Sequence, residues 1–133
     1  MPSLEFHRHA ASENKITLRR LLSALPEDSA DNKWILTVAY YTALHLIEAT
    51  ADTLVPNNQQ IRSHADRLDF LETKSSRIKQ LFNKMHILTK ALQYGTSSES
   101  SVLEEAVSLF KTTGFRSAVQ KWLSEIERVL NSL

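Results

Sequence analysis

The stretch WILTVAYYTALHLIEA, residues 34–49, lies in the longest apolar-dominated run of the chain. Its apolar side chains occur on nearly every side of a helix rather than along one stripe, which is typical of a helix at the centre of a bundle. The run is about as long as a membrane span requires, but His45 and Glu48 would be costly in lipid. We therefore expect a buried helix over about residues 34–54 and no membrane segment.

Further helices are predicted on both sides of this segment from apolar spacing and capping residues. The clearest covers 76–93, where apolar residues recur at i, i+3, i+4 and i+7. The other predicted helices cover about 4–24, 63–72, 101–112 and 115–130. Together these ranges predict an all-α fold, an up-and-down bundle of four to five main helices with a short extra helix. We expect one domain over residues 1–133.

The composition excludes several classes of function. The 133 residues contain two Gly, three Pro and no Cys. A chain of this length can bury a core without cross-links, and the absence of Cys removes disulfides, thiolate nucleophiles, iron–sulfur clusters and Cys-ligated zinc. The first eleven residues lack the charged and then apolar plan of a signal peptide, so we expect a cytoplasmic protein.

Five polar side chains are expected to meet between the central helix and the short helix that follows it. Tyr41, His45 and Glu48 have the spacing i, i+4 and i+7, and His64 and Arg67 have the spacing i and i+3. Buried polar groups need partners, so we expect a His–Tyr hydrogen bond and an ion pair between Arg67 and Glu48. Such a cluster serves either as a network that docks two helices or as a ligand site.

Metal and catalytic motifs are weaker in this sequence. His45, Glu48 and His64 could supply three metal ligands, but the Glu-x-x-His order of carboxylate-bridged bundles is reversed and has no second copy. The chain contains no GxSxG motif, Gly-rich phosphate loop or HExxH motif. We therefore predict no metal, no cofactor and no assigned catalytic residue.

The net charge of +1 is an average over unequal segments. Residues 61–95 contain seven basic and three acidic side chains, a net +4, whereas the segments before and after carry −2 and −1. A basic segment of this kind can follow a phosphate backbone or attract an acidic partner. The candidate nucleic-acid contacts are Arg62, Lys79, His86, Lys90 and Tyr94.

Three stretches carry a family resemblance. They are the Tyr-Tyr-x-Ala-x-His-x-x-Glu-Ala pattern within 34–49, the Arg-Ser-His-Ala-Asp-Arg run at 62–67 and the Leu-Thr-Lys-Ala-Leu-Gln-Tyr run at 88–94. Over residues 34–95 the chain resembles the bacterial HEPN-like (higher eukaryotes and prokaryotes nucleotide-binding) helical proteins. The resemblance implies a bundle that is commonly dimeric. The family includes ribonuclease toxins, nucleotidyltransferase partners and RNA-processing accessories.

The departures from this family shape the functional prediction. Ribonuclease members carry an Arg, four to six residues and then a His, and none of the five histidines here has an Arg at that distance. Lys79 stands before His86, but Lys does not replace a planar guanidinium. The resemblance thus favours a non-catalytic homodimeric partner or nucleic-acid-associated accessory in a toxin–antitoxin or defence setting, with RNA or a nucleotidyltransferase as partner.

Two alternatives remain open. One is a divergent, metal-independent ribonuclease that acts across a dimer and uses His86 or His64 with Arg67 or Lys79. The other is a purely structural adaptor whose polar cluster only orders the core.

Overall fold

The computed structural model describes residues 4–26, 32–54, 61, 63–94, 108 and 114–133, and at residues 93 and 94 the backbone alone. Within these ranges the chain forms five helices and no strand, which confirms the all-α prediction. The helices are α1 (Leu4–Ala24), α2 (Asn32–Leu54), α3 (His64–Glu72), α4 (Ser76–Tyr94) and α6 (Phe115–Asn131).

The predicted bounds of these five helices lie within two residues of the observed ones. Local capping explains part of this agreement, because the hydroxyl of Ser63 accepts a hydrogen bond from the backbone N–H of Asp66 at 3.1 Å and so begins α3. The predicted helix at 101–112 lies outside the described residues, except for Ser108, which is helical.

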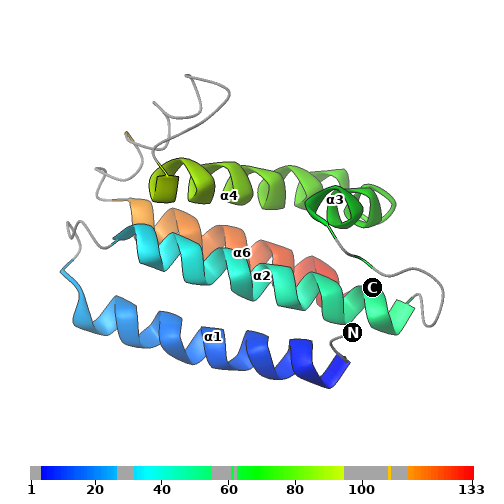
Figure 1. The fold of residues 1–133 in the computed structure, drawn as a ribbon, viewed down its shortest axis with the longest axis horizontal. Coiled ribbons are helices and arrows are strands. Elements are labelled where there is room, and N and C mark those ends of the chain that lie inside the picture. Colours follow the sequence, from blue (N-terminus) through cyan, green and yellow to red (C-terminus); the bar gives the residue numbers. More distant parts are fainter. Residues whose placement is uncertain (1–3, 27–31, 55–60, 62, 95–107, 109–113) are drawn as a thin grey trace.

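Helix α2 lies at the centre of the bundle and contacts α1, α3, α4 and α6. Figure 1 shows α1 along one side of α2, α4 and α3 along the other, and α6 beside α2. α1 and α4 run in one direction and α2 and α6 in the opposite direction, so the arrangement is the expected up-and-down bundle (Figure 1).

The core confirms the central position of α2. Thirteen of its 23 residues are buried, and Ile35, Leu36 and Ile47 have no exposed surface. They form one apolar cluster with Phe82 of α4 and Ile126 of α6. None of the described helices has both the length and the apolar content that crossing a bilayer would need.

A buried arginine ties three helices together at one end of the bundle. Arg116, in the first turn of α6, donates a hydrogen bond to the side-chain oxygen of Asn32 at 3.0 Å, and Asn32 is fully buried at the start of α2. The guanidinium of Arg116 also donates to the backbone oxygens of Leu22 and Pro26. These carbonyls lie at and beyond the end of α1, where helix carbonyls lack partners, so Arg116 satisfies them.

Candidate functional site: two histidine pairs

The expected ion pair between Glu48 and Arg67 is present. Arg67 Nε and Nη2 both donate to Glu48 Oε1, at 2.9 and 2.6 Å. Both side chains are largely buried, with 11% of the Glu48 side chain and 15% of the Arg67 side chain exposed. The cap at Ser63 begins α3 and α3 passes over α2, so Arg67 reaches a carboxylate from the preceding helix.

The second oxygen of this carboxylate binds a histidine that the sequence prediction missed. His7 Nε2 of α1 lies 3.0 Å from Glu48 Oε2, and His7 is only 6% exposed. His7 Nδ1 lies 3.0 Å from Nδ1 of His45. His7, Ala11 and Leu18 are the buried residues of α1, and their spacing places them on one face of the helix. The early part of α1 is too weakly apolar for this face to be recognised from the sequence.

These four residues, His7, His45, Glu48 and Arg67, form a continuous hydrogen-bonded chain that we name the His7 cluster. It connects α1, α2 and α3. Burial, followed by the neighbouring His7, lowers the pKa of His45 below its ordinary value. The ring of Phe6 packs edge-on against both imidazoles, with centroids at 5.4 Å from His7 and 5.9 Å from His45.

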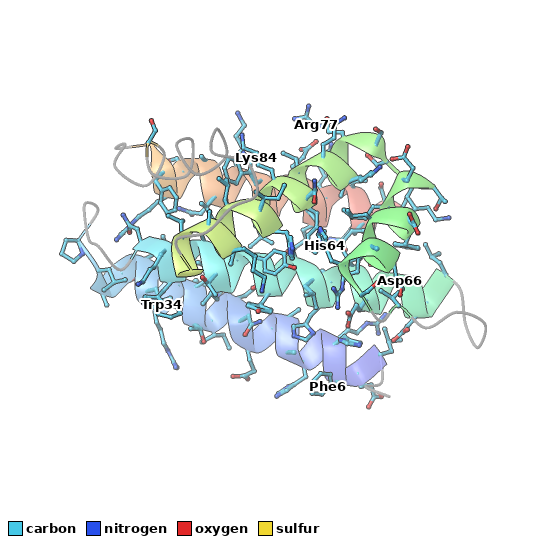
Figure 2. The ribbon with its side chains drawn as sticks, turned by 45° about the horizontal axis from the view of Figure 1, so that its top comes forward. Phe6, Trp34, His64, Asp66, Arg77 and Lys84 are labelled. Carbon is cyan, nitrogen blue, oxygen red and sulfur yellow. The ribbon has the colours of Figure 1, made fainter. Side chains whose placement is uncertain are left out.

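The second pair consists of His64 and His86. Their rings stack with centroids 3.6 Å apart and planes inclined by only 13°. His64 Nε2 lies 3.0 Å from Asn83 Oδ1, and this oxygen can only accept, so Nε2 carries the hydrogen. His64 Nδ1 is buried and has no hydrogen-bond partner among the described residues. Figure 2 shows His64 at the centre of the view, where α3 meets α4.

Tyr40 holds the other member of this pair. Its hydroxyl lies 2.8 Å from His86 Nδ1, and its ring stacks on Phe82 at 5.2 Å. Burial raises the pKa of Tyr40 to about 12. Burial, assisted by His64, Lys90 and Arg67, lowers the pKa of His86 to about 4. A protonated phenol therefore faces a neutral imidazole at pH 7.

The predicted cluster of five residues is thus split into two sites. His45, Glu48 and Arg67 belong to the His7 cluster, whereas His64 pairs with His86. The hydrogen bond expected between Tyr41 and a histidine of this cluster is not formed, and the one that the structure has joins Tyr40 to His86, two residues outside the predicted cluster. Tyr41 is 38% exposed and touches the edge of the Tyr40 ring. Adjacent helical residues point about 100° apart, and the packing of α4 on α2 selects Tyr40.

The candidate nucleic-acid contacts are only partly described. Lys79, His86 and Lys90 recur on one face of α4 together with Asn83, and all four side chains are half-buried. We name this set the α4 polar row. Lys79 also forms an ion pair with Glu72 at 3.0 Å. Arg62 and the side chain of Tyr94 lie outside what the structure describes.

A groove of about 470 Å³ lies elsewhere, between α1 and α6. Leu18, Leu22 and Leu123 contribute its apolar lining, and the ion pair between Lys15 and Glu127 lies at its edge. No histidine lines it. We therefore place the candidate chemistry at the histidine pairs and not in this groove.

Comparisons of this chain with protein-family models, with curated proteins and with solved structures find no match.

Proposed function

We propose that this protein is a cytoplasmic, non-catalytic, HEPN-like accessory that binds RNA along the α4 polar row. The observation that carries the proposal is the position of Lys79 and Lys90, one at each end of a row whose middle is the His64–His86 stack. Ammonium groups neutralise backbone phosphates, whereas ring edges and amides offer contacts without charge.

The charge of this region supports the proposal. Among residues 63–92, Lys and Arg number six and Asp and Glu number three, a net +3. Two of the cations, Arg77 and Lys84, lie on the other flank of α4, toward α6, where Arg77 pairs with Glu125 and Lys84 lies over the Trp122 ring. Figure 2 shows both at the outer edge of α4. Of the four cations of α4, Lys79 and Lys90 therefore belong to the α4 polar row, and Arg77 and Lys84 lie on the flank that faces α6.

Binding of labelled single-stranded RNA, measured by fluorescence anisotropy over a range of NaCl concentrations, tests this proposal. The double variant Lys79→Ala/Lys90→Ala is expected to bind more weakly and to reduce the slope of log K against log salt by about 1.4, since each lost phosphate contact contributes about 0.7. The matched control is Arg19→Ala/Arg20→Ala, which removes two charges from exposed positions on α1. Equal losses in both double variants, or no salt-dependent binding by the wild type, would refute the proposal.

The resemblance further supports a homodimer that works with a nucleotidyltransferase or another protein in a toxin–antitoxin or defence setting. Sedimentation of the purified chain tests the dimer. A monomer at all concentrations that RNA binding requires would remove this part of the proposal without affecting the RNA-binding part.

The stacked pair favours one second candidate, a metal-independent ribonuclease. Cleavage of RNA by attack of a 2′-hydroxyl needs one group to accept a proton and another to donate one. Two adjacent imidazoles can divide these roles where one of them is protonated, and the lowered pKa values of His64 and His86 confine this to acidic pH. RNA cleavage in EDTA that both His64→Ala and His86→Ala abolish, and that His9→Ala on the exposed face of α1 preserves, would support this candidate. Activity that survives both substitutions would indicate contamination.

The structural-adaptor alternative has a distinct signature. In that case His45→Ala lowers the melting temperature without changing RNA binding, because the His7 cluster would only order the helices. An unchanged melting temperature would count against it.

A further inference from the structure

We propose that His7, His45 and Glu48 form a binding site for a divalent transition-metal ion such as Zn²⁺, with Arg67 positioning the carboxylate. One ligand atom from each of the three side chains lies within 4.8 Å of the other two. This juxtaposition requires α1 to pack on α2, because His45 and Glu48 share a face of α2 and His7 comes from α1.

The chemistry of the donors indicates the class of ion. Two imidazoles and one carboxylate are the ligand set of many zinc sites that keep a fourth position for water. Ca²⁺ and Mg²⁺ prefer oxygen ligands alone, so they fit this set poorly. We therefore expect Zn²⁺ or Co²⁺ to bind and Mg²⁺ not to compete.

The present contacts show which hydrogens an ion would replace. The His7–His45 contact of 3.0 Å and the His7–Glu48 contact of 3.0 Å each need a hydrogen between the two atoms. Ligand atoms about 2.0–2.2 Å from a tetrahedral ion lie about 3.3–3.6 Å apart. Binding therefore requires one nitrogen of His7 to leave its present partner and requires the three ligand atoms, which now lie within 4.8 Å of one another, to adopt that spacing. His45 is half-buried, whereas His7 is buried, so we expect the His45 ring to make most of this movement.

Arg67 supplies the outer support that metal ligands commonly have. Both of its hydrogen bonds go to Glu48 Oε1, which orients Glu48 Oε2 toward His7. Groups that hold a ligand in this way typically change metal affinity by about 10- to 100-fold when removed. Phe6 covers the two imidazoles and is itself 52% exposed, so an ion can enter by displacement of one surface ring.

The stacked pair is a poor competitor for the same ion. Lone pairs of an imidazole lie in the plane of the ring, and the rings of His64 and His86 are nearly parallel, 3.6 Å apart. Their lone pairs therefore run side by side and do not converge on one point. This difference makes His86→Gln a matched control for His45→Gln.

The test uses the full chain without an affinity tag, because a histidine tag would itself bind the ion. Titration calorimetry with ZnCl₂, the visible absorption of the Co²⁺ complex and the melting temperature in ZnCl₂ are the three readouts. We expect one ion per chain and a melting temperature that rises with ZnCl₂. His45→Gln and His7→Gln should each weaken binding by at least about tenfold, whereas His86→Gln and His9→Gln should not.

The proposal fails if the wild type binds no ion at one per chain, or if His86→Gln weakens binding as much as His45→Gln. Circular dichroism of each variant without metal shows whether it folds. His45 is the more exposed of the two ligand histidines, so His45→Gln remains informative if His7→Gln does not fold. Loss of RNA binding in the Lys79→Ala/Lys90→Ala variant is a separate result and leaves the metal proposal untouched.

Discussion

Arg67 on α3 donates two hydrogen bonds to a single oxygen of Glu48 on α2, while the other oxygen of Glu48 faces His7 on α1. One carboxylate therefore joins three helices. Because most of the surface of this carboxylate is buried, its partners and not water stabilise its negative charge.

The Arg67→Ala substitution is expected to reduce the free energy of unfolding by about 3 kcal/mol, because it leaves the buried carboxylate of Glu48 without its cation. Arg67→Lys should lose less stability, since the positive charge remains. Some loss should persist, because Lys cannot reproduce the two-donor geometry of Arg67. The control is Arg77→Ala, whose ion pair with Glu125 is formed by a side chain that is 72% exposed, and it should cost less than about 1 kcal/mol. Urea denaturation measures all three, and similar losses for Arg67→Ala and Arg77→Ala would contradict the prediction.

The two adjacent tyrosines are expected to respond differently to loss of their hydroxyls. Tyr40→Phe removes the hydrogen bond to His86 and should cost about 1 kcal/mol. Tyr41→Phe changes a side chain that is 38% exposed and should stay within about 0.5 kcal/mol of the wild type. Thermal or urea denaturation measures both. A larger loss for Tyr41→Phe would mean that α2 is rotated relative to the described structure.

Acidification is expected to weaken the fold through His86. The pKa of His86 is lowered from 6.5 to about 4 by burial and by His64, Lys90 and Arg67. Between these values the unfolded chain binds more protons than the folded one, so the stability due to neutral His86 is complete above pH 6.5 and is lost as the pH falls toward 4. Because the ring is half exposed and screened by water, this contribution is on the order of 1 kcal/mol.

Urea denaturation at pH 7 and pH 5 measures this effect. The loss of stability between the two should be smaller in His86→Gln, which cannot take up the proton, and unchanged in His9→Gln, which alters an exposed histidine of α1. His64 has its pKa lowered by burial and acts in the same direction, so part of the pH dependence will remain. An identical pH dependence in His86→Gln and wild type would exclude this account.

The buried Arg116 is expected to be as important for stability as a core residue. Arg116→Ala leaves the oxygens of Asn32, Leu22 and Pro26 without their donor and should cost about 2–4 kcal/mol. Arg128→Ala on the same helix is the control, because that side chain is 67% exposed and pairs only with Glu125 among the described residues. Its loss should lower the melting temperature far less. Melting curves of the two variants that coincide would contradict the prediction.

The helices were predictable because the information that specifies them is local. Ser63 lies next to the helix that it caps, and the apolar spacing of 76–93 describes one helix without reference to the others. The apolar character of α2 on nearly every side indicated its central position for the same reason. These features require only neighbours in the chain.

The candidate site was predictable only in part. The Glu48–Arg67 ion pair followed from a hairpin of consecutive helices and opposite charges. His7 did not, because it meets His45 from 38 residues away and its own helix gives a weak signal. Arg116 meets Asn32 across 84 residues, and no pattern in the sequence marks it as buried.

The ends of the helices, the central helix and the basic segment all follow from the order of residues, since they depend on spacing within one turn or one segment. Which polar groups meet depends on how the helices pack. Each side chain of a helix points in a direction that its position fixes, but the packing of the helices determines which of these directions faces a partner. For this reason Tyr40 and not Tyr41 reaches His86. Packing also divided the expected cluster of five residues into the His7 cluster and the His64–His86 stack, because α1 and α4 lie against α2 from different sides.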